Sequence, residues 1–283
     1  MLKSYFFDKN DSRDRLGAEF GFLKLAWERG IRNVPEPIIS DVDLHIALLS
    51  FVGGRKLESH ELTIEHISMA IDFVVRINEL PPPRGFPQAS EACFRMLDHR
   101  ATVDARIERL SRLDKNAPFA DHAETLIRTR LLPAWEHVRR SCPWEVLGAD
   151  DDVVNAIISP SDFGFHNALA EAERLTFLDF EYAGLDDPAK LICDFFCQPE
   201  VPVGDGPLSS VIEKMQIYLD LGEKFSERTI SLLPPYRIKW ACIMLNEFVD
   251  LGRRRRAFSG GEEDLPAKCE RQINAVGDLL DRL

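Results

Sequence analysis

Three polar residues in the middle of the chain have the types and the spacing of a metal-dependent transfer site. Asp162 and Asn167 lie in one loop, and Asp179 follows at the end of the next apolar run. Mg²⁺ takes one or two protein oxygens and fills its other positions with water and phosphate oxygens, so an Asn and an Asp suit it. Residues 159–167 contain no Lys or Arg, and a loop carboxylate without a neighbouring cation can accept a proton from a hydroxyl group. Asp and Asn are also ordinary turn residues, and the spacing alone leaves that alternative open.

A tight hairpin is expected to bring the two predicted metal ligands together. Residues 168–171 and 175–180 are typical of its two arms. A turn centred between Ala172 and Glu173 pairs Asn167 with Leu178 and sets it diagonally beside Asp179. Opposed and diagonal side chains of a hairpin lie close enough to share one cation.

A second charged pair is predicted near the start of the chain. Residues 2–7 are typical of a strand, which carries Lys3. Glu19 lies between Leu16 and Leu23 on the apolar face of the following helix, where an unpaired carboxylate would be costly. Lys3 is its nearest candidate partner, and a strand lysine held by a helix glutamate directs an ammonium group at nucleotide phosphates. A structural ion pair or a solvated helix face is the alternative.

The elements that must position these residues fall into two regions. Strands at 2–7, 34–39 and 44–52 and a helix that Asp11 or Ser12 caps and Gly30 ends form a small α+β part, residues 1–53. Residues 54–283 are mostly helical, with a short strand at 153–158 and the hairpin. One predicted helix starts at Ile64, and another is capped by Asp186 or Asp187. Further helices are predicted over 90–113, 119–140, 208–226, 235–252 and 262–282.

The composition is that of a folded, acidic protein. The chain has 283 residues, a net charge of −12, 45% hydrophobic residues and 29% charged residues. These values exclude wholesale disorder and argue against a general nucleic-acid binder, which needs a positive surface. The sequence shows no signal peptide and no run of about 20 apolar residues, so we expect a cytoplasmic protein without a membrane span. The six cysteines lack metal-site spacing and are interpreted as reduced core residues.

Together these residues resemble the aminoglycoside phosphotransferase and choline kinase-like family, the small-molecule branch of the protein-kinase-like fold. The resemblance is densest at residues 159–167, 177–181 and 187–191. It implies a two-lobe fold, with a small nucleotide lobe at 1–53 and a helical lobe at 54–283. It also implies an ATP- and Mg²⁺-dependent phosphotransferase that acts on a hydroxyl of a small molecule, with an amino-sugar or another cationic acceptor as one class.

The resemblance assigns a role to each site residue. Asp162 would be the catalytic base, and Asn167 and Asp179 would hold Mg²⁺ against the ATP phosphates. Lys3 would contact the α- and β-phosphates, locked in place by Glu19.

Two further sets of residues follow from the resemblance. The backbone of the interlobe hinge would meet the adenine, and this hinge includes Ser50, Phe51 and Val52. One helical segment of the second lobe would line the acceptor pocket through Asn246, Glu247 and Asp250. A solvated helix face explains these last three residues equally well.

Three features depart from the family pattern. Pro160 and Ser161 stand where the family usually has His-Gly, and Glu181 replaces the glycine of Asp-Phe-Gly. The family's first two strands and phosphate-covering loop would precede Lys3, where this sequence has two residues. Either the true start lies upstream or the chain is a genuine fragment with an open nucleotide site, and the first is favoured because natural proteins avoid uncovered sheet edges.

The rival function is a catalytically weak kinase-like binding or regulatory protein that lost the phosphate loop.

Overall fold

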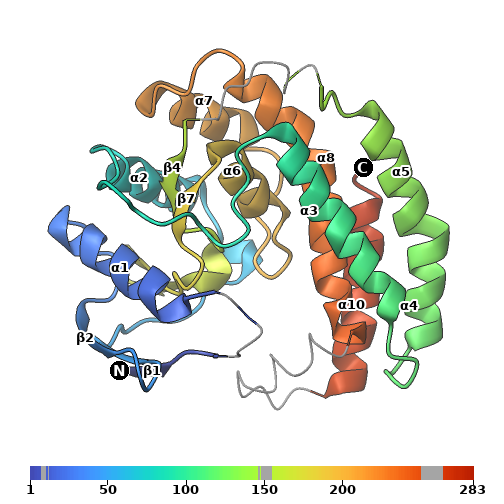
Figure 1. Cartoon of the computed structure of the whole chain (residues 1–283), viewed down its shortest axis with the longest axis horizontal. Coiled ribbons are helices and arrows are strands. Elements are labelled where there is room, and N and C mark those ends of the chain that lie inside the picture. Colours follow the sequence, from blue (N-terminus) through green and yellow to red (C-terminus); the bar gives the residue numbers. More distant parts are fainter. Residues whose placement is uncertain (8–10, 12, 146, 148–154, 250–263) are drawn as a thin grey trace. The chain divides into compact units, whose positions relative to one another are not determined.

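The computed structural model describes residues 1–7, 11, 13–145, 147, 155–249 and 264–283 (Figure 1). Contacts divide the chain into two compact units, each made of two stretches of sequence. The first unit comprises Met1–Phe94 and Val153–Thr229, and the second comprises Arg95–Asp152 and Ile230–Leu283. The predicted boundary at residue 53 lies inside the first unit, so the division into 1–53 and 54–283 stays a prediction.

A three-stranded antiparallel sheet opens the first unit. Its strands are β1 (Leu2–Ser4), β2 (Pro37–Asp41) and β3 (Ile46–Leu49), in the order β1-β3-β2. Lys3 lies opposite the buried Ala47 of β3. The strand predicted over 2–7 is shorter than expected because β3 begins at Ile46, and pairing ends with the Tyr5 N–H donating to the His45 carbonyl at 2.9 Å.

Helix α1 (Arg15–Glu28) packs on this sheet and begins at a different cap from the predicted one. The Asp14 side chain accepts a hydrogen bond from the Gly17 N–H at 2.8 Å and so caps the helix. The prediction that Asp11 caps this helix is wrong, because its carboxylate accepts hydrogen bonds from the Arg13 and Arg15 side chains instead. Ser12 lies outside the described residues. Gly30 follows the helix with a φ of 75°, in agreement with its prediction as the stop.

Helix α2 (Ile64–Ile77) is tied to a second small sheet at its end. The Asn78 side chain bonds both the N–H and the carbonyl of Ile158, at 2.8 and 2.9 Å. Ile158 belongs to β4 (Ile157–Ser159), which pairs with β7 (Gly184–Asp186). The sequence did not predict β7, because three residues that include Gly and Asp carry no strand pattern.

The hairpin has the predicted register. Its strands are β5 (Ala168–Glu171) and β6 (Arg174–Phe177), with Ala168 opposite Phe177 and Glu171 opposite Arg174. The second arm starts one residue earlier than predicted and ends at Phe177. Helix α6 (Pro188–Cys197) then starts behind the Asp187 cap, as predicted, and α7 (Leu208–Tyr218) follows. The helix predicted over 208–226 stops early, because the chain leaves the helix at Asp220, which has a φ of 51°.

Aromatic side chains join these elements in the core of the first unit. Phe180, next to the predicted metal ligand Asp179, stacks on Phe22 of α1 with ring centroids 4.4 Å apart. Phe73 of α2 lies 4.9 Å from Phe177 at the end of β6, and 5.7 Å from Phe163 beside Asp162. This cluster therefore fixes the loop and the hairpin against both helices.

The second unit is helical. It contains α3 (Met96–Arg109), α4 (Ala120–Leu126), α5 (Leu132–Ser141), α10 (Leu265–Leu280) and most of α8 (Phe225–Met244). Figure 1 shows α4 and α10 side by side. A π-helical turn at Ile127–Leu131 joins α4 and α5 where one helix was predicted. The helix predicted to start at 235 begins at Phe225 instead and continues through Pro234 and Pro235, which a sequence pattern treats as a break.

Two expectations from composition can be compared with the described residues. None of their helices has both the length and the apolar character needed to cross a bilayer. Five of the six cysteines are buried and Cys142 is partly buried, in agreement with their interpretation as core residues.

Candidate active site

The predicted ion pair between Lys3 and Glu19 forms, and it includes a third residue. The Lys3 ammonium donates to Glu19 Oε2 at 2.6 Å and to Asp179 Oδ1 at 2.8 Å. Glu19 is 1% exposed, whereas the Asp179 side chain is 42% exposed. Lys3 therefore spans from the interior of the first unit to a carboxylate that solvent reaches. We call Lys3, Glu19 and Asp179 the open cluster.

The charges of the open cluster follow from its surroundings. Burial by itself would lower the pKa of Lys3, but the Glu19 and Asp179 carboxylates outweigh it and raise that pKa above 10.5. Burial raises the pKa of Glu19, and the Lys3 ammonium opposes the rise. Burial, together with the Glu19 carboxylate, also raises the pKa of Tyr5, whose ring lies 5.1 Å from the Lys3 ammonium. At neutral pH the site thus holds a cationic lysine beside a neutral phenol.

Backbone contacts fix the metal-binding candidates. The Leu178 N–H donates to the Asn167 carbonyl at 2.8 Å, which extends the hairpin pairing as predicted. Asp179 follows with a φ of 64°, in the left-handed region, and Glu19 Oε1 accepts the next N–H, that of Phe180, at 3.3 Å. The Asn167 amide nitrogen donates to the Asp162 carbonyl at 3.0 Å. The Asn167 amide oxygen is then the atom suited to a cation.

Asp162 is held by a strained loop. Ser161 before it has a φ of 67°, a region that a serine adopts at a cost. The Ser159 hydroxyl accepts the Ser161 N–H at 3.1 Å, and the Phe163 N–H donates to the Ser161 carbonyl at 2.8 Å. These bonds maintain the turn that carries Asp162, whose side chain is 38% exposed. Sequence reasoning missed Ser159, because a strand serine carries no signal of its own.

His166 contacts Asp162. Its Nε2 lies 3.2 Å from Asp162 Oδ1, and its ring is largely buried. Extended beyond its paired strands, the hairpin register would set His166 opposite Asp179, where its ring could contact a metal or stabilise the loop by a hydrogen bond. The i, i+4 spacing of Asp162 and His166 could have indicated this contact from sequence. The short helical turn Phe165–Asn167 brings the two side chains together.

A second ion pair joins α1 to the segment after the hairpin. The buried Arg15 side chain has its Nε 3.6 Å from Glu181 Oε1, and it also donates to the Phe6 carbonyl at 3.0 Å and to Asp11 at 2.6 Å. Glu181 is the residue that departs from Asp-Phe-Gly. No local sequence pattern pairs Glu181 with Arg15, because the two residues are far apart along the chain.

The predicted hinge residues follow β3. The Ser50 N–H donates to the Glu36 carbonyl at 2.9 Å, and the Ser50 hydroxyl accepts the Glu36 N–H at 2.8 Å. Phe51 is 82% exposed and Val52 is half-buried. Whether their backbone meets adenine stays a prediction.

The segment after the hinge is fastened to the hairpin. Arg55 and Ala170 exchange two backbone hydrogen bonds of 3.0 and 2.8 Å. Gly54 has a φ of 111°, and a Cβ there would lie 2.7 Å from the Ala170 carbonyl oxygen. Glycine is therefore required at this close approach, which couples the hinge to the predicted metal ligands.

Sequence comparison decides the family. The phosphotransferase enzyme family matches residues 2–196, which include the open cluster, the loop of Asp162 and the hairpin. The chain belongs to this phosphotransferase family. No curated protein sequence matches it.

Solved structures share the fold of this phosphotransferase. A choline/ethanolamine kinase family protein from Mesorhizobium loti is 16% identical with a TM-score of 0.56, over 96% of this chain and 80% of the other. A choline kinase from Streptococcus pneumoniae is 12% identical with a TM-score of 0.56, over 98% and 85%. A spectinomycin phosphotransferase in complex with ADP and spectinomycin is 12% identical with a TM-score of 0.58, over 100% and 85%. The α+β, protein-kinase-like fold predicted from sequence is confirmed.

The residues of this phosphotransferase fit a Mg²⁺–nucleotide pair. Among the described residues, no three His, Cys, Asp or Glu side chains converge on one point as a metal cluster would require. Asn167 and Asp179 supply two oxygens, which is the protein share that Mg²⁺ takes when phosphates and water complete its shell. The Lys3 ammonium beside Asp179 is the matching charge for phosphate oxygens.

The predicted acceptor residues belong to the second unit. Glu247 is buried, and its carboxylate lies 3.1 Å from the Lys268 ammonium. Asn246 is half-buried, and its carbonyl accepts the Val249 N–H at 3.1 Å. Asp250 lies outside the described residues. A role for these residues toward an acceptor stays a prediction.

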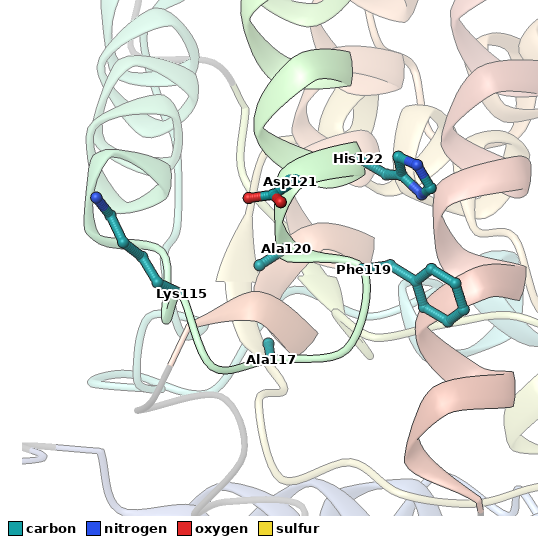
Figure 2. Close-up of a pocket in the computed structure, with 6 residues that line it drawn as sticks. All are labelled: Lys115, Ala117, Phe119, Ala120, Asp121 and His122. Atoms are coloured by element: carbon teal, nitrogen blue, oxygen red, sulfur yellow. The ribbon is translucent and has the colours of Figure 1, made fainter.

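A shallow hollow of about 230 Å³ also lies in the second unit, and it contains none of the predicted site residues. Figure 2 shows the rings of Phe119 and His122 side by side, with Lys115 extending on the other side of the loop. Phe119 has a φ of 60° at the start of α4. The remaining lining residues are Ala117, Ala120 and Asp121.

Proposed function

We propose that this phosphotransferase transfers the γ-phosphoryl group of ATP to a hydroxyl of a small molecule, with Mg²⁺ held by Asn167 and Asp179. The observation that carries the proposal is Lys3, which joins the buried Glu19 to the exposed Asp179. A cation and a metal-binding carboxylate 2.8 Å apart meet the two needs of a nucleotide's phosphates.

The chain's own residues account for positioning and proton transfer. The acceptor hydroxyl binds at Asp162, whose carboxylate takes the proton as the oxygen bonds to the γ-phosphorus and ADP leaves. Lys3 neutralises charge on the phosphate oxygens, and Glu19 keeps the ammonium aimed at them. Mg²⁺, when bound, adds charge neutralisation between the phosphates. Because such chemistry depends mainly on placement, the strained loop and the aromatic core that fix Asp162 are part of the mechanism.

We propose an alcohol that also carries an amino or ammonium group as the acceptor class. The names of structures with this fold include choline, ethanolamine and spectinomycin. The net charge of −12 favours a cationic acceptor over an anionic one.

The test is ADP release with ATP, Mg²⁺ and a panel of amino alcohols, amino sugars and neutral sugars. Wild type is expected to turn over at least one amino-containing acceptor. Asp162→Asn is expected to lower kcat by about 10³-fold, the scale of general base catalysis, with an unchanged rise in Tm on adding ATP and Mg²⁺. Equal turnover by both proteins, or no rise in Tm for wild type, would contradict the proposal and favour a kinase-like binding protein.

A further inference from the structure

We propose that His166 is a positioning residue for Asp162, with its Nε2–H donating to Asp162 Oδ1 so that the second carboxylate oxygen faces the acceptor hydroxyl. This inference rests on the proposed function of Asp162. It assigns a role to a residue that the family resemblance left without one.

The geometry places the histidine between the core and the reacting carboxylate. Nε2 lies 3.2 Å from Asp162 Oδ1, the His166 side chain is 10% exposed and the Asp162 side chain is 38% exposed. A long, exposed side chain in place of His166 would rotate and would not hold the Asp162 carboxylate in one direction. A ring packed in the loop keeps Asp162 Oδ1 in place, while the carboxylate as a whole remains partly exposed.

The other ring nitrogen indicates which tautomer is present. Within the described part of the chain, His166 Nδ1 is buried and has no hydrogen-bond partner. A proton on Nδ1 would leave a buried donor unpaired and would set the lone pair of Nε2 against Asp162 Oδ1. A neutral ring therefore carries its proton on Nε2, where the carboxylate accepts it.

Gly164 supplies the space that this arrangement needs. A Cβ at residue 164 would lie 2.8 Å from His166 Nδ1 and 3.0 Å from Cε1, closer than side-chain atoms normally approach. Gly164 has a φ of 169°, an extended conformation that any residue adopts. Backbone conformation therefore does not require a glycine at residue 164, whereas the space that the His166 imidazole occupies does. Gly164→Ala becomes a second way to displace the ring without changing His166.

The experiment compares kcat and KM for ATP with Mg²⁺ in wild type, His166→Leu, His166→Gln and Gly164→Ala. Loss of the donor in His166→Leu is expected to lower kcat by about 10- to 100-fold, the scale of a misplaced catalytic group, with KM for ATP within about twofold. His166→Gln places an amide N–H near the position of Nε2 and is expected to recover most of kcat. Gly164→Ala is expected to resemble His166→Leu.

The matched control is His60→Leu, which removes an exposed imidazole 3.4 Å from an exposed Glu58 carboxylate in the same unit. It is expected to leave kcat unchanged. Equal kcat in His166→Gln and His166→Leu, or a full wild-type kcat in His166→Leu, would overturn the positioning role.

A second measurement separates this inference from the proposed function. If wild type releases no ADP with any acceptor, the proposed function fails, and ¹⁵N NMR of the histidine ring still tests the contact. The neutral ring is expected to be protonated on Nε2 in wild type. A neutral ring protonated on Nδ1 would overturn the inference whatever the turnover.

Discussion

Two lysines of the first unit are each held by two carboxylates, and they differ in how much solvent reaches them. The Lys190 ammonium lies 2.5 Å from Asp186 and 3.7 Å from Asp194, and all three side chains are 7% exposed or less. The Lys3 side chain is 24% exposed, and that of its partner Asp179 is 42% exposed. The same charge types thus form a buried cluster in one place and an open cluster in the other.

The difference shows what separates a structural ion pair from a candidate binding site. In the buried cluster Asp186 also accepts the N–H groups of Cys93 and Asp187, both at 2.9 Å, so the protein itself satisfies the charge. In the open cluster the Asp179 side chain is exposed to solvent. Lys190 and its partners are therefore expected to control stability, and Lys3 and its partners to control turnover.

The largest expected effect comes from breaking the buried cluster with Lys190→Met. It leaves buried carboxylates without their cation, which costs about 3–5 kcal/mol, measured as the free energy of unfolding in urea. Lys214→Met is the control, because its pair with Asp72 is partly exposed and is worth less than about 1 kcal/mol. Equal losses in the two variants would remove the distinction between the clusters.

The pH dependence of the buried cluster has a defined sign. Burial alone would lower the pKa of Lys190, but Asp186 and Asp194 raise it above 10.5. The stabilisation is fully present below 10.5 and is lost as the pH rises through the folded-state pKa. The stability gap between wild type and Lys190→Met is expected to narrow only in strongly alkaline solution.

Breaking the open cluster with Lys3→Met is expected to reduce turnover by about 10²- to 10³-fold, the scale of one lost charge-stabilising donor. It also leaves Glu19 buried without its cation, so some stability is lost. The double variant Lys3→Met with Glu19→Gln is expected to recover stability without recovering turnover. Steady-state ADP release and urea unfolding of both proteins check this, and turnover that returned with stability would make the open cluster structural.

A smaller effect is expected where α1 is anchored beside the open cluster. Hydrogen bonds from Arg13 and Arg15 hold the pKa of Asp11 below its ordinary 3.8. Its stabilisation is present above pH 3.8 and is lost as the pH falls through the folded-state pKa. Asp11→Asn is expected to cost about 1–2 kcal/mol at pH 7, which is the scale of a hydrogen bond to a charged group reduced by solvent screening, and less in acid. A difference in unfolding free energy that grew in acid would contradict this sign.

The smallest expected effect concerns backbone strain at and near the candidate site. Ser161 and Asp179 have positive φ, whereas Asp186, Lys190 and Asp194 do not. Ser161→Gly removes about 1–2 kcal/mol of strain but adds unfolded-chain entropy worth about 0.5–1 kcal/mol, so a net gain of about 0.5 kcal/mol is expected, with lower turnover. Ala172→Gly, in the hairpin turn with a φ of 53°, is the control and should gain stability at unchanged turnover. Higher turnover in Ser161→Gly would show that the strain has no role in placing Asp162.

Local rules predicted the parts of the site that depend on near neighbours in sequence. The hairpin register, the Asp187 cap and the Gly30 stop follow from turn, cap and strand patterns a few residues long, and all three are confirmed. The Lys3–Glu19 pair was also predictable, because a buried carboxylate needs a cation and one lay on the preceding strand.

Other features depend on residues that are far apart along the chain or on small shifts in geometry. Lys3 bonds Asp179 as well as Glu19, and a sequence pattern cannot show a contact across 176 residues. Strand β7 was missed because its pairing with β4, and not its composition, makes it a strand. The roles assigned to Ser50, Phe51, Val52 and the residues near 246 depend on ligands, so they remain predictions.

The central claim is that the open cluster binds the phosphates of a nucleotide with Mg²⁺. Calorimetric titration of ATP into wild type and Asp179→Asn, each with and without Mg²⁺, tests it most directly. Asn tolerates the left-handed backbone at this position, so the variant is expected to fold. We predict Mg²⁺-dependent binding of ATP by wild type and its loss in Asp179→Asn. Equal ATP binding by both proteins, or ATP binding by wild type that does not depend on Mg²⁺, would contradict the claim.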